Sequence, residues 1–256
     1  MGELFHEKIA ANTYLISDST AGPNENGKSL LPGTATANAY LAVGSKEAVL
    51  IDLSVRKPGL ADYAEKLAGK PLRIALTHAH VDHIFYANKC KELWLHPDDE
   101  RLLRHGALPF QKPLLRCPNL HYLNDGEWMD LGNRPIQVIH IPGHTDGSIM
   151  FYDLNNRILF SGDSIARRLL YGLHTKVPVE EYIAQLEHVR EMGIDKIYSA
   201  HDRCALSKDN IDYMIPVMRG RGIYSERTDK IPLLGKMITR EAGAESKLLY
   251  FSFAFR

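Results

Sequence analysis

Hydrophobic positions along the chain fall into short runs that predict strands. Each run is rich in β-branched and aromatic residues and lies between turn-forming residues, as expected for a strand with a buried face. In the first half of the chain these runs occupy residues 12–17, 38–44, 47–53, 73–77 and 93–96. In the second half they occupy residues 136–141, 148–154, 157–163, 196–200 and the tail at 247–256. The segment DLNNR (153–157) predicts a hairpin turn between two of these strands.

Three segments carry the longer apolar spacing of a helix. Residues 180–193 place four apolar side chains on one face, namely Ile183, Leu186, Val189 and Met192. Gly193 is expected to cap the C-terminus of this helix. Weaker helical patterns cover residues 60–71 and 210–220, and Pro216 is expected to interrupt the second of them.

The order of these elements predicts a layered α/β fold. Two strand-rich halves, each with helices to cover one sheet face, favour two sheets packed together with helices outside. A chain of 256 residues with 45% hydrophobic residues can bury one large core. We therefore expect a single domain over residues 1–256.

Charge and cysteine content narrow the class of partner. Thirty-one Lys and Arg balance 31 Asp and Glu, so no overall basic field would attract nucleic acid or an anionic membrane. The N-terminus shows no signal-peptide pattern, and no apolar run approaches the length of a membrane span. The 3 cysteines, Cys90, Cys117 and Cys204, are widely spaced, which suits a reducing compartment. We expect a cytoplasmic protein with a small-molecule substrate, without nucleic-acid or membrane partners; the sequence does not indicate its oligomeric state.

The segment THAHVDH (77–83) concentrates histidine and aspartate directly after a predicted strand. Neutral imidazole is the commonest protein ligand for metals, and a cation offsets the cost of burying these polar groups together. Three further candidates follow later predicted strands: His144 in PGHTDGS, Asp163 in FSGDS and His201 in SAHD. Rigid strands that end at one edge can bring such distant residues together.

The number of candidate ligands suits a pair of metal ions. Seven nitrogen and oxygen donors make two pockets of three, with one carboxylate left to bridge and a shared water to complete both shells. The donors are imidazole and carboxylate, so zinc is the leading metal, and iron or manganese fits the same set. Other histidines, including His96 and His140, are interpreted as surface or core residues.

The motif H-x-H-x-D-H, followed by spaced His, Asp and His, resembles the metallo-β-lactamase fold superfamily of metal-dependent hydrolases. The resemblance covers nearly the whole chain, including LIDLS (50–54), and implies a four-layer αββα sandwich of two mixed sheets flanked by helices. It implies one metal held by His78, His80 and His144, a second held by Asp82, His83 and His201, and Asp163 as the bridging ligand. Asp52 would support the ligands from behind, since ligating histidines usually donate their other N–H to an oxygen.

The reaction implied is hydrolysis. Two close divalent ions lower the pKa of a bridging water toward neutrality, and the resulting hydroxide attacks a carbonyl or phosphoryl group that the ions polarise. Asp82 would orient this nucleophile. The bond attacked is a thioester, lactone, ester or phosphodiester of a small molecule.

Through the family resemblance, Asp163 narrows the class of substrate expected for this chain. True β-lactamases lack this aspartate, whereas glyoxalase II-like thioesterases, lactonases and phosphodiesterases carry it. Ala166 stands where lactonases place a tyrosine, which disfavours acyl-homoserine lactones. In the stretch 164–176, Arg168, Tyr171 and His174 are candidates for substrate recognition, against the alternative of a solvated loop with one aromatic residue packed inward. Residues 19–36 form a predicted long loop, either plain surface or a flap over the site.

Two other classes of function remain open. Persulfide dioxygenases also resemble this chain and hold a single iron with residues corresponding to His78, His144 and Asp163. A degenerate, non-catalytic binding member of the superfamily is the second alternative, although such members usually lose ligands. Metal content and oxygen consumption separate these classes.

Overall fold

The computed structural model describes residues 3–18, 38–106, 119–202, 204–231, 235–244 and 249–255. The predicted loop at 19–36 and Cys117 lie outside the described residues. Cys90 and Cys204 are half-buried free thiols. Within the described part of the chain, no helix is both long and apolar enough to cross a membrane.

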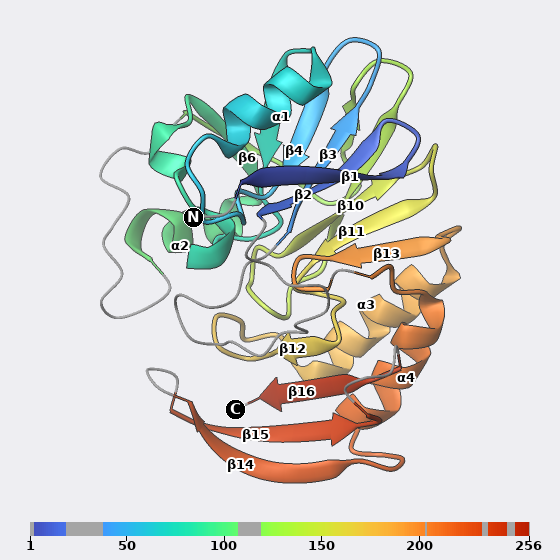
Figure 1. Ribbon diagram of the computed structural model, residues 1–256. Coiled ribbons are helices and arrows are strands. Elements are labelled where there is room, and N and C mark those ends of the chain that lie inside the picture. The colour runs from blue at the N-terminus through green and yellow to red at the C-terminus, as the bar shows by residue number, and fades with distance from the viewer. Residues whose placement is uncertain are drawn as a thin grey trace.

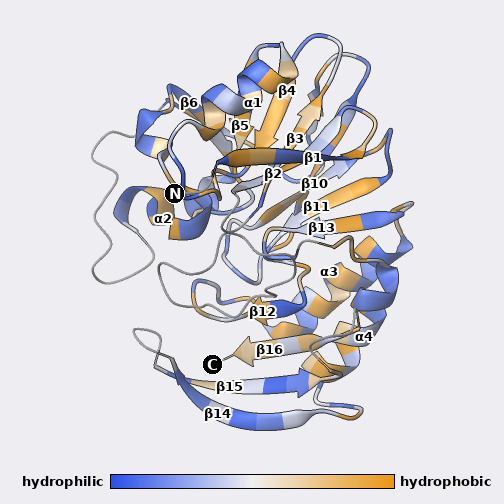
Figure 2. Ribbon diagram, in the orientation of Figure 1, coloured by the Kyte–Doolittle hydropathy of each residue, from blue (hydrophilic) through white to orange (hydrophobic). Residues whose placement is uncertain are grey.

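The first sheet contains seven strands in the order of the sequence. They are β1 (Leu4–Ala10), β2 (Thr13–Asp18), β3 (Ala39–Val43), β4 (Ala48–Ile51), β5 (Leu72–Ala75), β6 (Glu92–Leu95) and β7 (Asn119–Tyr122). Strands β1 to β4 pair antiparallel, and β4 to β7 pair parallel, so the sheet is mixed. Figure 2 shows β3 and β4 as strongly hydrophobic, which fits their burial on both faces.

The second sheet contains five strands in the order β13-β11-β10-β9-β8. Their bounds are β8 (Trp128–Asp130), β9 (Pro135–His140), β10 (Ile149–Asp153), β11 (Ile158–Gly162) and β13 (Lys196–Ser199). The predicted hairpin turn joins β10 to β11, where Asp153 pairs with Ile158. Strands β9 and β11 both run antiparallel to β10, and β13 runs parallel to β11, so β9, β11 and β13 point the same way.

The two sheets pack face to face with helices on their outer faces, as predicted (Figure 1). One core cluster joins Tyr40 and Ile51 of the first sheet to Phe151 and Phe160 of the second. Helices α1 (Leu60–Ala68) and α2 (Glu100–His105) cover the outer face of the first sheet, and α3 (Val179–Glu191) and α4 (Lys208–Met218) cover the second. Three short 3-10 helices, η1 (Val81–His83), η2 (Ala87–Lys89) and η3 (Pro97–Asp99), lie between strands of the first sheet.

A third sheet extends the two-sheet architecture that the sequence predicts. It has the order β12-β16-β15-β14, with β12 (Arg168–Leu170), β14 (Ser225–Ile231), β15 (Gly235–Ala242) and β16 (Phe251–Phe255). Of these, only β16 corresponds to a predicted strand, the closing strand of the tail. Phe251 and Phe253 pack into the same hydrophobic cluster as α3 and α4, so these helices lie between the second and third sheets (Figure 1).

Two helix ends differ from their predicted form. Helix α3 ends at Glu191, and Met192, in an extended conformation, occupies the C-cap position expected for Gly193. Helix α4 continues through Pro216, which the sequence predicted to interrupt it. Pro216 lies in the last turn, and the buried side chains of Ile215 and Val217 pack into the core around it. Burial of the apolar face therefore outweighs the loss of one backbone hydrogen bond.

Candidate metal centre

The predicted ligands come from segments that follow parallel strands. His78 and His80 follow β5, and Asp52 follows β4, which is the parallel neighbour of β5. In the second sheet, three of the predicted ligands come just after β9, β11 and β13, namely His144, Asp163 and His201. Because strands that point the same way end at one edge, the two sheets deliver their ligands to a common edge of the sandwich.

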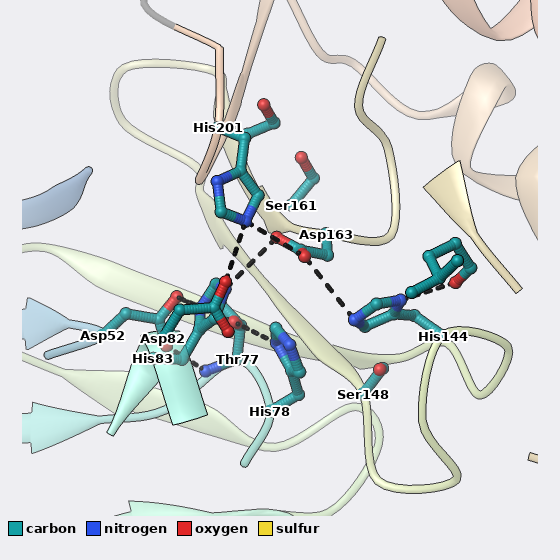
Figure 3. Close-up of polar contacts among 12 residues, drawn as sticks. Asp52, Thr77, His78, Asp82, His83, His144, Ser148, Ser161, Asp163 and His201 are labelled. Atoms are coloured by element: carbon teal, nitrogen blue, oxygen red, sulfur yellow. Dashed lines mark hydrogen bonds and ion pairs between the residues drawn. The ribbon is translucent and has the colours of Figure 1, made fainter. Parts of the chain in front are cut away.

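Asp163 lies at the centre of the cluster (Figure 3). Its Oδ2 is 3.3 Å from Nε2 of His201 and 3.5 Å from Nε2 of His144. Its Oδ1 is 3.3 Å from Nε2 of His83. The Asp82 carboxylate lies 3.4 Å from His201 on the other side. Asp163 thus contacts imidazoles from both of the ligand sets predicted from the sequence.

The cluster divides into groups whose potential ligand atoms all lie within 4.8 Å of one another. One group is His78, His80 and His144, and another is Asp82, His83 and His201. A third, made of His78, His83 and Asp163, overlaps with both. The structure therefore brings together all seven predicted ligands in the predicted grouping; their role as ligands stays a prediction.

Three buried histidines of the cluster are each oriented by a partner at Nδ1. His144 Nδ1 is 2.7 Å from the carbonyl oxygen of Leu170, and His83 Nδ1 is 2.9 Å from Asp52, and both partners only accept hydrogen bonds. Thr77 donates its hydroxyl proton to Asp52 and so accepts from His78 Nδ1. Each Nδ1 therefore carries a proton, and Nε2 of His78, whose pKa is lowered, is left as a bare acceptor. Burial alone would lower the pKa of His83, but Asp52 and Asp163 raise it, so without a metal the Nε2 of His83 carries a proton as well.

These Nε2 atoms show that the site fits a metal ion. The Nε2 atoms of His78, His83 and His144, together with Oδ1 of Asp163, are buried and lack a hydrogen-bond partner. Buried polar atoms without partners are costly, and here four of them converge on one place. A divalent cation would satisfy them, and the partners on the Nδ1 side fix each ring in the orientation typical of metal-ligating histidines.

Burial keeps part of the cluster in the neutral form that metals require. It lowers the pKa of His78 well below the usual value, and the nearby imidazoles of His83 and His144 add to the effect. Burial likewise lowers the pKa of His80, with a further contribution from His144. Both rings are neutral at neutral pH and need to release no proton before they bind a cation.

The part of the cluster around Asp82, Asp163 and His201 is held together by opposite charges. Burial alone would lower the pKa of His201, but Asp163 and Asp82 raise it to about 10. Burial would raise the pKa of both carboxyl groups, yet His201 and His83 hold these pKa values below the usual range. In the metal-free state, protonated imidazoles therefore balance the two carboxylates, and a cation would take over that role.

Asp52 supports two ligand-bearing segments at once. Besides His83, it accepts hydrogen bonds from the Thr77 amide at 2.7 Å and from the Thr77 hydroxyl at 2.8 Å. Thr77 in turn crowds Gly162, where an added Cβ would lie 2.5 Å from the threonine Oγ1. The predicted role of Asp52 behind the ligands agrees with these contacts.

The three candidate substrate residues lie in different surroundings. His174 Nδ1 lies 2.9 Å from His80 Nε2, so His174 supports a predicted ligand. Arg168 is on β12, with its guanidinium 5.4 Å from the ring centre of Tyr250. Tyr171 is buried in the core and donates to the carbonyl of Val177, as expected for the inward-packed aromatic residue of the alternative interpretation. We therefore do not carry Tyr171 forward as a substrate-binding residue.

Asp99 is a site residue that the sequence did not reveal. It is fully buried, and its Oδ2 accepts hydrogen bonds from the Ala79 amide at 2.7 Å and the Thr145 hydroxyl at 3.0 Å. Its Oδ1 accepts from the Gly147 amide at 3.0 Å. The carboxylate thus joins the segment of His78 and His80 to the loop of His144. Its Pro-Asp-Asp context is typical of a helix start, so no pattern in the sequence indicated this role.

Asp202 likewise joins two segments of the site, next to His201. Its Oδ2 accepts a hydrogen bond from the Arg167 amide at 3.0 Å and another from the Ser199 hydroxyl at 2.7 Å. The first bond ties the loop of His201 to the segment that follows Asp163. Buried carboxylates therefore fix neighbouring ligand loops to each other from behind.

Comparison with known proteins agrees with this fold. The model of the metallo-beta-lactamase superfamily matches residues 32–201. The acyl-coenzyme A thioesterase MBLAC2 of Homo sapiens is 25% identical over 202 residues, covering 64% of this chain and 72% of the thioesterase. The probable metallo-hydrolase YqgX of Bacillus subtilis is 28% identical over 142 residues, covering 51% of this chain and 67% of YqgX.

Solved structures show the same fold. The protein TTHA1623, crystallised in a di-iron-bound form, is 26% identical to this chain, with a TM-score of 0.52. The match covers 68% of this chain and 90% of TTHA1623. A metallo-beta-lactamase from Pontibacter korlensis has a TM-score of 0.65 at 14% identity. The match covers 86% of this chain and 100% of the lactamase chain, and at this identity it supports the fold alone. The chain belongs to the metallo-beta-lactamase superfamily.

Proposed function

We propose that this protein is a hydrolase with two divalent metal ions that cleaves thioesters of small molecules. The observation that carries the proposal is the position of Asp163, whose carboxylate contacts imidazoles of both ligand groups. A carboxylate between two such groups suits a bridging ligand. The first ion would be held by His78, His80 and His144, and the second by Asp82, His83 and His201.

The chain's own residues account for the orientation of the reactants. Bound divalent ions would supply two effects: a lowered pKa for a water molecule and polarisation of the substrate carbonyl. The Asp82 side chain is 34% exposed, the most open of the carboxylates in the cluster, so it can accept a hydrogen bond from the attacking water. Asp52, Asp99 and Asp202 keep the ligand loops in register, which limits reorganisation during the reaction.

The thioester class is favoured by the thioesterase relative and by Asp163. MBLAC2 acts as an acyl-coenzyme A thioesterase, and the motif of this chain resembles thioesterase-like members of the family. Zinc suits the imidazole and carboxylate donors, and iron suits them as well. We propose zinc, and metal analysis of the purified protein decides between the two.

The test combines metal analysis with a substrate panel. The full chain is reconstituted with zinc, and hydrolysis of an acyl-coenzyme A thioester, a lactone, an ester and a phosphodiester is measured. We expect about two zinc ions per chain, with the highest kcat/KM for the thioester. His201→Gln should lose one ion and reduce kcat/KM by about 100-fold or more. His188→Gln, an exposed histidine on α3, is the control that should change neither value.

Other outcomes of this test would overturn the proposal. One iron per chain, with oxygen consumed in the presence of a persulfide, would assign the protein to the dioxygenases. No metal and no turnover would assign a binding role. A preference for the phosphodiester or lactone would refute the thioester assignment alone.

A further inference from the structure

A basic patch lies outside the cluster, at the same edge of the first sheet. It consists of Arg56 and Lys57, which follow β4, and Lys89, which is the last residue of η2. The Leu53 amide donates a hydrogen bond to the carbonyl of His83 at 3.0 Å, so the two segments leave this edge side by side. The basic patch and the predicted ligands therefore share one edge of the sandwich.

Two aromatic rings hold cations of the basic patch in place. The Arg56 guanidinium carbon is 6.0 Å from the centre of the Phe85 ring, and the Lys89 ammonium is 5.3 Å from the centre of the Tyr86 ring. Both rings are half-buried, whereas Arg56 and Lys89 are exposed. An aromatic face attracts a cation, so these contacts restrict two flexible side chains while their N–H donors stay open to solvent. Because the two rings are adjacent in the chain, they keep both cations in one patch.

The backbone of Tyr86 is fixed in a conformation that tyrosine rarely adopts. Its φ is 61°, in the left-handed region, where a bulky side chain is strained. The Tyr86 carbonyl accepts a hydrogen bond from the Lys89 amide at 2.8 Å, so the strained residue and the cation belong to one turn. Strain of this kind persists where the surroundings impose it, and it is frequent in segments that bind ligands.

The charge of the basic patch is not balanced by carboxylates. Within the described residues, Arg56, Lys57 and Lys89 take part in no ion pair. Other surface arginines are paired, for example Arg157 with Asp195 at 2.9 Å. The chain as a whole has no net charge, so these three cations create a local positive field. Such a field favours a ligand that carries several negative charges.

We propose that Arg56, Lys57 and Lys89 bind the phosphate groups of a coenzyme A thioester, an inference that rests on the proposed function. Coenzyme A carries a diphosphate and a separate ribose phosphate at one end of its pantetheine arm, and the thioester forms at the other end. A basic patch at the edge of the metal centre suits these phosphates when the carbonyl lies at the metals. Arginine and lysine both bind phosphate through charge-assisted hydrogen bonds.

The first experiment compares two thioesters of the same acyl group in the zinc-loaded full chain. One is the acyl-coenzyme A, and the other is the acyl-N-acetylcysteamine, which has the thioester but no phosphate. Arg56→Gln/Lys89→Gln should raise KM for the acyl-coenzyme A by about tenfold, because charge-assisted hydrogen bonds to phosphate are lost. Neither kcat nor KM for the short thioester should change. Added salt should raise the native KM for the acyl-coenzyme A and affect this variant less.

Lys66→Gln/Lys70→Gln is the matched control. Both lysines are exposed, and they lie in the last turn of α1 and just before β5, at the opposite end of the first sheet. The change in net charge equals that of Arg56→Gln/Lys89→Gln, so an effect of overall charge alone would appear in both variants. We expect native KM values for both thioesters in this control.

Calorimetry with coenzyme A separates a failure of this inference from a failure of the proposed function. Coenzyme A itself has no thioester, so its binding does not require hydrolysis. The native chain should bind coenzyme A about tenfold more tightly than Arg56→Gln/Lys89→Gln does. Both proteins should bind pantetheine equally, since it has the same thiol but no phosphate. This binding pattern without thioester turnover would support the basic patch and overturn the proposed function alone.

Several results would overturn the role of the basic patch. Equal KM and equal affinity for coenzyme A in the native chain and Arg56→Gln/Lys89→Gln would show that it does not bind the phosphates. The same rise in KM for both thioesters, or in the Lys66→Gln/Lys70→Gln control, would show that phosphate recognition is not what changed. Native binding to phosphatidylserine vesicles, lost in Arg56→Gln/Lys89→Gln, without binding of coenzyme A would assign the basic patch to a membrane surface.

Discussion

Asp52 adopts a left-handed backbone conformation, with φ at 65°, immediately after β4. Aspartate and asparagine tolerate this conformation better than other residues with a side chain. The bend points the carboxylate back toward Thr77 and His83, where it accepts hydrogen bonds from both. Backbone conformation and ligand support are therefore combined in one residue.

Asp52→Asn should weaken the metal centre while leaving the fold intact. Asparagine keeps the left-handed conformation but removes the negative charge and one acceptor oxygen, so the His83 ring loses its anchor. Changes behind a metal ligand typically reduce metal affinity or activity by about 10–100-fold. Chelator competition measures the affinity, and circular dichroism checks the fold. Asp62→Asn on exposed α1 should match the native protein, and an equal affinity in Asp52→Asn would contradict the supporting role.

Cys90 should react slowly with alkylating reagents. Burial raises the pKa of its thiol to about 11, from an ordinary value of 9.0. Only the thiolate reacts, so at pH 8 the native rate should be about 100-fold below that of the same cysteine in urea. The rate should rise about tenfold per pH unit until the pH nears the raised pKa. Peptide mass spectrometry follows Cys90 alone, and equal rates in native and urea-treated protein would contradict the burial effect.

At the scale of elements, the apolar pattern predicted the buried strands and missed most of the edge strands. β3, β4, β10 and β11 are buried along nearly their whole length, so each appears as a continuous apolar run. The strands β1, β7, β8 and β14 are sheet edges with polar or exposed positions, and the pattern did not indicate them. Figure 2 shows β14 as mostly hydrophilic, which also protects that edge from pairing with another chain.

The 3-10 helix η3 matters because Asp99 connects two ligand loops. Asp99→Asn places an amide group against donors from Ala79, Thr145 and Gly147, so at least one buried donor loses its acceptor. The expected cost is about 1–3 kcal/mol of unfolding free energy. Metal content at the first site should fall as well.

Thermal unfolding of metal-free protein, together with metal analysis, tests this role of Asp99. A loss of that size should lower Tm by about 2–4 °C per kcal/mol for a chain of this length. Asp98→Asn, one position earlier and exposed, should change Tm little under the same conditions. Native Tm and native metal content in Asp99→Asn would show that the three hydrogen bonds contribute nothing.

At the scale of the whole molecule, the site was more predictable than the architecture around it. The motifs that carry the seven predicted ligands follow predicted strands, so their convergence at one edge was expected, and the family resemblance implied their grouping. The third sheet could not be predicted in this way, because Arg168–Leu170 pairs in parallel with Ser252–Ala254, which lies far along the chain. No local pattern encodes a pairing of that range.

Arg134 joins the two sheets at the end of the sandwich opposite the metal centre. It donates to the carbonyls of Val43 in the first sheet and of Asn12 in the turn between β1 and β2, and to the carboxylate of Asp153 in the second sheet. Val43 pairs with Ala48 at the start of β4, whereas Asp52 follows the end of β4. The arginine side chain is 6% exposed and that of Asp153 is 0% exposed, so this ion pair is buried.

Replacing Arg134 should therefore destabilise the fold without altering the chemistry of the site. Arg134→Met leaves the Asp153 carboxylate buried without its cation, and breaking a buried pair in this way typically costs about 3–5 kcal/mol. Arg157→Met is the matched control, because its ion pair with Asp195 has side chains 55% and 59% exposed, and such pairs contribute about 0–1 kcal/mol. Urea unfolding gives both values, and metal content is measured in parallel. Equal losses in the two variants would mean that Arg134 does not hold the sheets together.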